Sequence, residues 1–169
     1  METCYMCQRA ACSREHVPPK NLFPESKDFD GRNFRINLIT VPSCKLHNSA
    51  KSKDDEFLMV SLAGIFGNNS IGIRHRIGKV TRALHRVSNK LLDEVFTERR
   101  VIDRIDMKNN RFLEVIWGTP DHDRLIKCFD HVVRGLFFIN LKRNLPETQK
   151  FIWDTLSKKK QDHAIFRVL

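Results

Sequence analysis

Two pairs of metal-binding residue types with the same short spacing constrain this chain more than any other feature. Cys4 and Cys7 form a Cys-x-x-Cys pair, and Cys44 and His47 form a Cys-x-x-His pair later in the chain. Zinc in structural sites binds four Cys or His ligands in a tetrahedron, and paired ligands at this spacing are typical of such sites. The two pairs therefore predict a structural zinc ion that holds residues 4–47 together.

Two other interpretations of these cysteines are weaker. One is a reduced, buried set that binds no metal, and the other is a redox-active Cys4/Cys7 pair. Redox pairs of this type lie where a strand leads into a helix, whereas Tyr5 and Met6 lead into polar coil. Two coincident pairs are also rarer than a single pair, so zinc is the favoured interpretation and Cys12 is a spare thiol.

The segment that contains these pairs has little means of folding by itself. Residues 1–45 are rich in proline and turn residues, with short extended runs expected at 15–17 and 37–41. Such a segment buries little apolar surface. Structural zinc contributes roughly 10–16 kcal/mol in small zinc domains, which is enough to organise it.

The charge balance points to an anionic partner. Thirty Lys and Arg residues stand against twenty Asp and Glu, giving a formal net charge of +10. Such an excess is expected of a chain that meets phosphates, and we expect DNA as the partner. Acidic membrane surfaces and ribosomal surfaces are the alternative partners for a chain of this charge. No secretory signal is visible at the N-terminus, so a cytoplasmic location is expected. The most apolar run, 132–141, is short and carries Arg134, so it is not expected to span a bilayer.

Glu15 and His16 stand before two prolines, which favour an extended backbone for the dipeptide. Adjacent strand residues point to opposite faces, so one of them can hold a metal while the other polarises a water. An isolated Glu-His pair is most often solvated surface. Its functional interpretation depends on what the zinc site places against it.

A helix is expected after His47, and four of its polar residues share one face by their spacing: Asn48, Lys51, Ser52 and Asp55. The zinc site would bring this face toward the strand that carries Glu15 and His16. Phosphodiester hydrolysis needs a hard divalent cation, an activated water and a positive charge near the phosphate. Glu15 and Asn48 suit the cation, His16 the water, and Lys51 the phosphate.

The order of these motifs resembles the HNH endonuclease family, which has a ββα-metal fold, over roughly residues 4–56. The motifs that carry the resemblance are Cys4-x-x-Cys7, Glu15-His16-Val17-Pro18, Asn37-Leu38-Ile39-Thr40 and Cys44-x-x-His47-Asn48-x-x-Lys51. The resemblance implies that His16 is the general base, that Glu15 and Asn48 hold the catalytic metal, and that Asn37 supports the histidine loop. That metal is expected to be Mg²⁺ or another divalent cation such as Mn²⁺ or Ni²⁺.

Two positions differ from the usual family pattern. His47 closes the second zinc pair where many relatives have cysteine, an exchange that zinc tolerates. Asn48 stands where many relatives have histidine, and its neutral amide oxygen is a weaker metal ligand. Asp55 is a candidate additional ligand for the catalytic metal, whereas Asp54 points off the expected face.

The rest of the chain predicts a second, mainly helical domain. A loop rich in Gly and Asn over 64–72 marks the expected boundary, giving domains 1–66 and 67–169. Helices are expected over 77–95, from Thr119 as N-cap with Pro120 as the first helical residue, and from 146 to about 160. Strands are expected at 111–117 and at the end of the chain, where the apolar run hints at truncation or at docking into a sheet edge.

The first of these helices carries a basic stripe made of Lys79, Arg82, Arg86 and Lys90. The stripe either tracks a nucleic-acid backbone or is an ordinary solvated face, and the net charge makes the two interpretations about equally strong. His122 and His131 are expected near a helix cap or on the surface, not as ligands.

Taken together, the sequence predicts an α+β protein with an N-terminal zinc-held ββα-metal module and a mainly α-helical second domain with a few short strands. The expected function is metal-dependent endonuclease activity. The alternatives are a catalytically weak zinc-dependent module that binds nucleic acid or protein, and a nuclease subunit of a phage-defence or mobile-element system that needs a protein partner.

Overall fold

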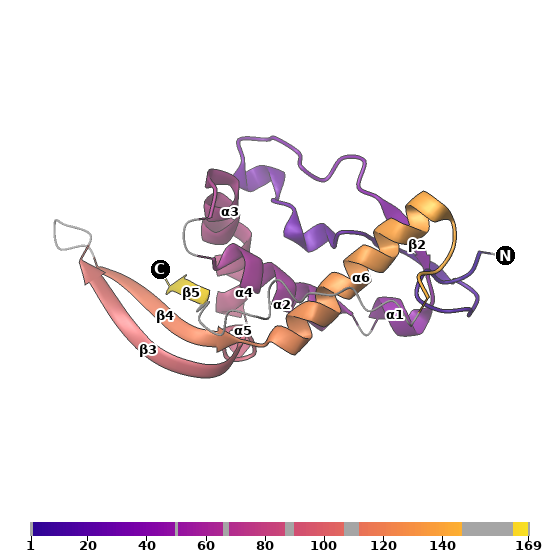
Figure 1. The fold of residues 1–169 in the computed structure, drawn as a ribbon. Coiled ribbons are helices and arrows are strands. Elements are labelled where there is room, and N and C mark those ends of the chain that lie inside the picture. Colours follow the sequence, from indigo (N-terminus) through magenta and orange to yellow (C-terminus); the bar gives the residue numbers. More distant parts are fainter. Residues whose placement is uncertain are drawn as a thin grey trace. The chain divides into compact units, whose positions relative to one another are not determined.

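The computed structural model describes residues 2–49, 51–65, 68–86, 90–106, 112–146 and 164–168. Its elements are helices and short strands, so the α+β class is confirmed (Figure 1). The residues form two compact units. Unit 1 comprises Met1–Phe23, Phe34–Leu58 and Asp123–Lys158, and unit 2 comprises Pro24–Asn33, Met59–His122 and Lys159–Leu169. This grouping differs from domains 1–66 and 67–169, whose boundary stays a prediction.

Unit 1 begins with a small antiparallel sheet of β1 (Ser13–His16) and β2 (Thr40–Ser43). Glu15 lies opposite Val41 and His16 opposite Thr40. Because neighbouring strand residues point to opposite faces, Glu15 is buried while His16 is half-buried. The extended run expected over 15–17 is thus close to β1.

The extended run expected over 37–41 begins too early. Asn37 lies in a turn before β2, with an exposed side chain and a φ of 56°. This left-handed conformation is one that asparagine tolerates better than most residues, and it prevents Asn37 from extending the strand.

Short helical segments complete the N-terminal part of unit 1. η1 (Lys20–Leu22) follows the two prolines, and α1 (Lys45–Ser49) begins directly after Cys44. The next helix is α2 (Ser52–Ala63), of which residues 52–58 belong to unit 1 and residues 59–63 to unit 2. The polar face expected on one helix is therefore divided between α1 and α2. Phe57 and Leu58 on α2 are buried and anchor it by apolar packing.

Helix α6 (His122–Leu141) also belongs to unit 1, apart from its first residue. Its residues Val132, Leu136, Phe138 and Ile139 pack against the buried cluster of Cys4, Tyr5, Val17, Val41 and Cys44. The approach is close at Gly135, where an added Cβ would lie 2.6 Å from Cγ2 of Val17. A side chain at this position would push the helix away from the core.

The predicted start of this helix is wrong. β4 runs through Thr119 and Pro120, and α6 begins at His122. A Thr-Pro pair is compatible with a helix start, but here Thr119 pairs with Glu98 in a sheet. The pairing partner, not the local pattern, decides the conformation.

Asp54 on α2 joins α6 by two ion pairs, from Nε of Arg124 at 2.9 Å and from Nζ of Lys127 at 3.0 Å. Burial alone would raise the pKa of Asp54, but hydrogen bonds from Lys127 and Arg124 hold that pKa below its usual value. A carboxylate with a lowered pKa stabilises the fold above its unfolded pKa. It loses this contribution as the pH falls through the folded value.

We expect Asp54→Asn to lower the free energy of unfolding by about 1–3 kcal/mol at neutral pH, between the values typical of exposed and buried ion pairs. The difference from the wild type should shrink below about pH 4, where the carboxylate becomes protonated. Denaturant unfolding at pH 7 and pH 3 measures it. Equal stability at pH 7, or a difference that grows with acid, would contradict this role.

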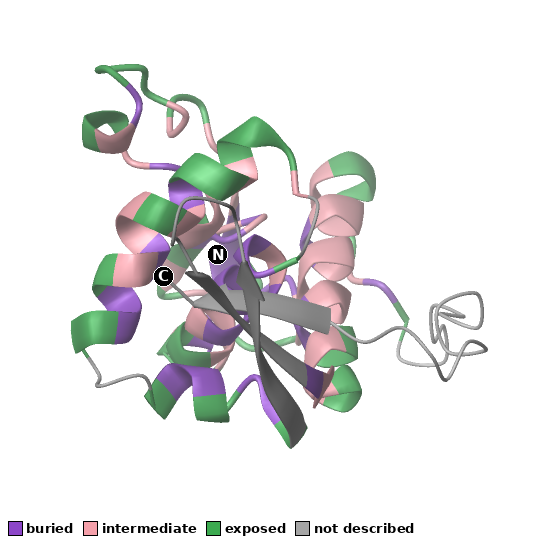
Figure 2. Cartoon of the chain, turned by 90° about the vertical axis from the view of Figure 1, so that its left-hand side faces the viewer, coloured by how far each residue is buried: buried purple, intermediate pink, exposed green. Residues whose placement is uncertain are grey.

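Unit 2 contains η2 (Ser26–Asp28), α3 (Ser70–His75), the π-helical turn η3 (Arg76–Val80), α4 (Thr81–Arg86) and α5 (Lys90–Asp93). Asn69 caps α3 by accepting a hydrogen bond from the Gly72 backbone N–H at 2.8 Å. Gly72, predicted as loop, is therefore inside the helix. Figure 2 shows buried, intermediate and exposed residues by colour along the chain.

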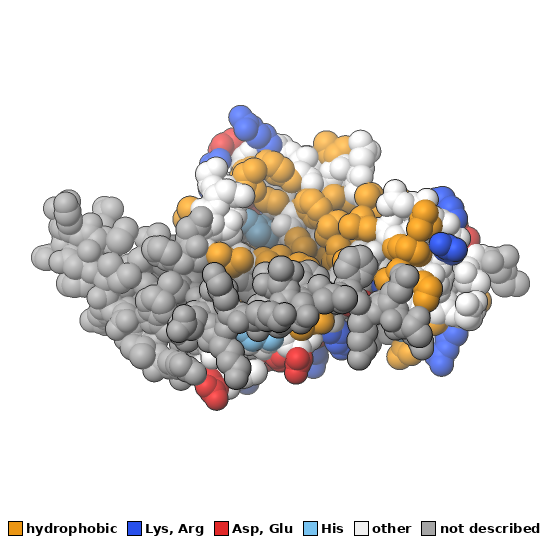
Figure 3. Space-filling model, in the orientation of Figure 1, with side chains coloured by type: hydrophobic (Ala, Val, Ile, Leu, Met, Phe, Trp, Pro, Cys, Tyr) orange, Lys and Arg blue, Asp and Glu red, His pale blue; other side chains and the backbone are white. Residues whose placement is uncertain are grey.

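The apolar rhythm expected over 77–95 holds only in part. Val80, Leu84, Leu91 and Val95 are buried, but Ile77 is 55% exposed. The π-helical turn contains one more residue per turn than an α-helix, so residues before it face differently from what a regular helix predicts. Ile71 and Ile73 are also exposed, and Figure 3 shows apolar side chains on the face it draws.

A three-stranded antiparallel sheet lies in unit 2, with β4 (Phe112–Pro120) between β3 (Phe96–Asp106) and β5 (Ala164–Val168). The strands expected at 111–117 and at the chain end are confirmed, and the end strand docks on a sheet edge. β3 was not predicted, since its charged sequence lacks regular alternation. The helix expected from 146 to 160 lies almost entirely outside the described residues. Among the helices described, none is long and apolar enough to cross a membrane.

Candidate metal centre and adjoining pocket

The four predicted zinc ligands converge in unit 1. Cys4 and Cys7 lie on the N-terminal loop, Cys44 follows β2, and His47 lies on α1. Their ligand atoms are all within 4.8 Å of one another, and they form the one such group of His, Cys, Asp and Glu among the described residues. The structure thus brings the four predicted residues together as a possible metal site.

Four of the six distances within this cluster are close to the edges of a zinc tetrahedron, and the other two are within 4.8 Å. Nδ1 of His47 lies 3.5 Å from Sγ of Cys4, 3.6 Å from Sγ of Cys7 and 3.4 Å from Sγ of Cys44. Sγ of Cys7 and Sγ of Cys44 are 3.9 Å apart. With usual Zn–S and Zn–N bond lengths, the edges of such a tetrahedron are about 3.5–3.8 Å. The donors therefore fit zinc in both chemistry and spacing.

Backbone groups support the cluster. The backbone N–H of His47 donates to the Cys44 thiol sulfur, which lowers the pKa of Cys44 to about 6 and favours the thiolate that binds metal. The side-chain amide of Asn144 donates to the carbonyl oxygens of Cys4 and Cys7, at 3.0 and 3.2 Å. Asn144, placed by the sequence in another domain, thus braces the first zinc pair.

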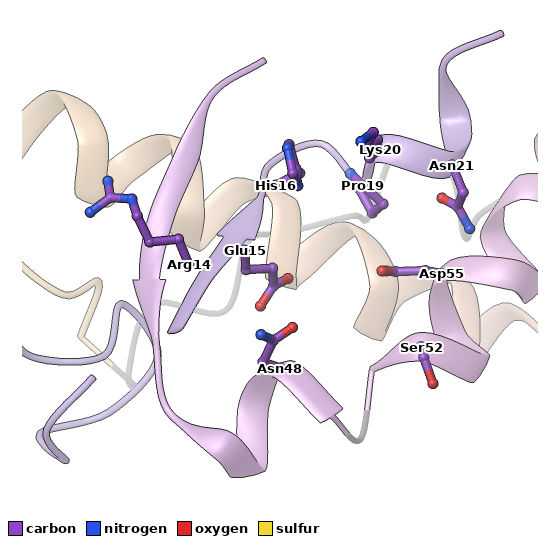
Figure 4. Close-up of a pocket in the computed structure, with 9 residues that line it drawn as sticks. All are labelled: Arg14, Glu15, His16, Pro19, Lys20, Asn21, Asn48, Ser52 and Asp55. Atoms are coloured by element: carbon purple, nitrogen blue, oxygen red, sulfur yellow. The ribbon is translucent and has the colours of Figure 1, made fainter. Parts of the chain in front are cut away.

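An open pocket with a volume of about 280 Å³ lies in unit 1 beside this cluster. Figure 4 shows side chains from β1, the following loop, α1 and α2 around it. Its lining residues are Arg14, Glu15, His16, Pro19, Lys20, Asn21, Asn48, Ser52 and Asp55. The pocket therefore brings together four predicted site residues, namely Glu15, His16, Asn48 and Asp55.

Glu15 is the most constrained of these side chains, at 6% exposed. Its Oε1 accepts hydrogen bonds from the Tyr5 hydroxyl at 3.2 Å and from Nζ of Lys51, and its Oε2 accepts one from the Ser43 hydroxyl at 3.4 Å. A buried carboxylate without such donors would be strongly disfavoured. Its position is therefore set by three neighbours.

Asn48 and Asp55 reach the pocket from the two helices. Nδ2 of Asn48 donates to Oγ of Ser13 at 2.8 Å. Figure 4 shows the Asn48 amide and the Glu15 carboxylate facing each other, with the Asp55 carboxylate directed toward the same space. Burial raises the pKa of Asp55 to about 6, although Lys51 opposes the shift.

Lys51 has a different environment from the one predicted. Its side chain is 3% exposed, and its ammonium pairs with Glu15 and, at 3.5 Å, with Asp55. The cations that line the pocket and are exposed are Arg14 and Lys20. A phosphate contact by Lys51 stays a prediction, and it would require the ammonium to leave these carboxylates.

The other predicted site residues lie elsewhere. Asn37 does not line the pocket. The basic stripe of Lys79, Arg82, Arg86 and Lys90 belongs to unit 2. Within that unit Arg82 binds Asp28 at 2.8 Å and Glu25 at 2.7 Å, so its charge is already balanced.

Comparison with known proteins adds no relative. No family model, curated protein or solved structure matches the chain. Its function therefore has to be inferred from its own residues.

Sequence reasoning missed Tyr5 and was wrong to expect His131 near a helix cap or on the surface, since it lies half-buried in the middle of α6. The Tyr5 hydroxyl lies 3.4 Å from Nδ1 of His131, and the rings of His131 and His47 meet edge to face at 6.5 Å. Burial lowers the pKa of His131 to about 4, so its imidazole is neutral at physiological pH. The one available signal was the position of Tyr5 between two zinc cysteines. Nothing in the local sequence distinguishes His131.

Proposed function

We propose that this chain is a metal-dependent endonuclease of the HNH type that hydrolyses phosphodiester bonds, with DNA as the favoured substrate. The pocket carries this proposal. It combines a histidine, two carboxylates and two carboxamides beside a Cys₃His cluster. The order β1, β2, α1, with the first zinc pair before β1 and the second at the junction of β2 and α1, supports the ββα-metal arrangement that the resemblance implies.

The donors of the pocket suit a hard cation. Glu15, Asn48 and Asp55 offer oxygen atoms, which Mg²⁺ and Mn²⁺ prefer, whereas the Cys₃His cluster offers the softer ligands of zinc. A bound divalent cation would stabilise negative charge on the phosphate and the leaving oxygen. The two sets of ligands therefore separate a structural metal from a catalytic one.

His16 is assigned as the general base. Its imidazole nitrogen takes a proton from water, the water oxygen bonds to phosphorus, and the bond from phosphorus to the leaving oxygen breaks. The leaving oxygen then takes up a proton. Histidine is the side chain that most often serves as a general base in enzymes. Lys20, at the exposed side of the pocket, is suited to hold the phosphate backbone, and Arg14 can join it after exchanging its partner Glu2, which lies 3.1 Å away.

The wider setting is proposed on the same basis. Zinc thiolates persist in a reducing compartment, which favours the cytoplasm. The formal charge of +10 favours DNA as partner, and the stripe Lys79, Arg82, Arg86 and Lys90 is a candidate contact in which Arg82 first has to exchange its acidic partners. Control by a protein partner, as in a phage-defence or mobile-element system, remains part of the proposal.

A second candidate is a zinc-dependent binding module without catalysis. It is favoured by the Glu15 carboxylate, whose oxygens already accept hydrogen bonds from Lys51, Tyr5 and Ser43. The neutral amide of Asn48, which is a weaker metal ligand than histidine, also favours this candidate. In such a module Lys51 would permanently replace the catalytic cation.

Plasmid DNA distinguishes the two functions. The zinc-loaded chain is incubated with supercoiled plasmid and Mg²⁺, Mn²⁺, Ni²⁺ or Ca²⁺, and each sample is run with and without protein digestion. A nuclease leaves relaxed or linear DNA after the protein is removed. A binding module retards the plasmid, which returns to its supercoiled position after digestion.

A further inference from the structure

We propose that Tyr5 is a positioning residue for Glu15, so that the zinc cluster sets the orientation of the carboxylate in the pocket. This inference rests on the proposed function, because it concerns the carboxylate assigned to the catalytic metal. It gives the residue between the two zinc cysteines a role beyond packing.

The Tyr5 hydroxyl is buried and donates a hydrogen bond to the Glu15 carboxylate. The side chain is 0% exposed, and its hydroxyl donates to Oε1 of Glu15 at 3.2 Å. A buried hydroxyl without a partner costs free energy, so the donor cannot be left unpaired without loss of stability. The terminal torsion of a glutamate is otherwise broad, and a donor on one oxygen restricts how the carboxylate turns.

Tyr5 is also fixed to the zinc cluster through its backbone. Its N–H donates to the Pro42 carbonyl at 2.9 Å, and the N–H of Cys7 donates to the Cys4 carbonyl at 3.2 Å. The neighbouring residue Cys4 supplies a thiol to the cluster. A zinc ligand and a donor to the pocket carboxylate are therefore adjacent in the sequence.

Helix α6 supports the hydroxyl from its other side. Nδ1 of His131 lies 3.4 Å from the Tyr5 oxygen. When Nδ1 carries the imidazole proton, it donates to that oxygen and directs the hydroxyl proton toward Glu15. His131, Tyr5 and Glu15 then form a chain of hydrogen bonds that ends at the pocket.

The test compares Tyr5→Phe with the wild type, both loaded with zinc. Phenylalanine keeps the buried ring and removes the hydroxyl alone. Outer-sphere partners of metal ligands typically change metal affinity or activity by about 10–100-fold when removed. We expect Mn²⁺ to bind Tyr5→Phe about 10–100-fold more weakly by electron paramagnetic resonance. Cleavage should fall by a similar factor at limiting Mn²⁺ and recover at high Mn²⁺.

Val41→Ala serves as the packing control, since Val41 lies in the same buried cluster and carries no polar side-chain atom. It should lower the melting temperature and leave the Mn²⁺ dependence unchanged. His131→Gln provides a second variant, which should weaken Mn²⁺ binding in the same direction and is independent of how well Tyr5→Phe folds.

The outcomes separate this inference from the proposed function. If the wild type binds Mn²⁺ and cleaves DNA while Tyr5→Phe and His131→Gln show the wild-type Mn²⁺ dependence, the positioning role is overturned and the nuclease assignment stands. If the wild type neither binds Mn²⁺ beside zinc nor cleaves, both are overturned. Weaker binding in both variants with unchanged zinc content supports the role of Tyr5.

Discussion

Replacing His16 with alanine should abolish DNA cleavage while leaving the zinc content and the fold intact. A positioned general base contributes about 100-fold to 10,000-fold to the rate, so a loss of this size is expected. His16 lies half-buried on the wall of the pocket, outside the zinc cluster and the buried apolar cluster of unit 1. Its removal therefore takes away chemistry without removing a core side chain.

The measurement is the cleavage rate at saturating Mg²⁺ or Mn²⁺, together with zinc content and melting temperature. His122→Ala is the matched control, because His122 is exposed on α6 and does not line the pocket. The control should cleave at the wild-type rate. Cleavage by His16→Ala at the wild-type rate would remove His16 from the mechanism.

Removal of zinc should unfold the N-terminal part of unit 1. The cluster joins the N-terminal loop to the end of β2 and the start of α1, and the sheet between them has two strands of four residues each. A two-stranded sheet of this size is marginal alone, and structural zinc contributes roughly 10–16 kcal/mol in comparable sites. The free energy lost with the metal is therefore expected to exceed the stability that the remaining contacts of this segment provide.

Hydrogen exchange measures this prediction in the wild type, in chelated protein and in Cys44→Ala. Protection of residues 2–49 should be lost in the last two samples. Exposed Cys12→Ala is the matched thiol control and should behave as the wild type. Asn144→Ala should lose zinc more readily but remain folded when zinc is present. Unchanged protection after chelation would show that the cluster does not hold this segment.

The zinc cluster could be predicted from the sequence because its information is local. Cys4 with Cys7, and Cys44 with His47, are each recognisable as a ligand pair by their spacing alone. The two pairs together supply the four ligands of one structural zinc ion. The strand that carries Glu15 was accessible for a similar reason, since the prolines after it limit the backbone.

Long-range contacts could not be predicted in this way. The contact between Tyr5 and His131 joins residues 126 positions apart, and that between Asn144 and Cys4 joins residues 140 positions apart. No periodicity in one segment reveals which distant helix covers it. The packing of α6 on the zinc module, and with it the outer part of the pocket network, therefore appeared only in the structure.

Side-chain burial and backbone conformation produced the other differences. Lys51 was expected to contact phosphate because its helical position faces the pocket, but the carboxylates of Glu15 and Asp55 bury its ammonium. Asn37 was expected in a strand, but its backbone adopts a left-handed conformation, which a strand residue does not have. Spacing gives the direction of a side chain and does not give its partners.

The central claim is that the pocket uses a divalent cation, separate from zinc, to cut DNA. Its most direct test is metal addition to zinc-loaded protein that is already mixed with end-labelled DNA. The DNA should stay intact without added metal and should be cut once Mg²⁺ or Mn²⁺ is supplied, and His16→Ala should not cut it under either condition. Intact DNA after addition of every metal, or equal cutting with and without metal, would contradict the claim.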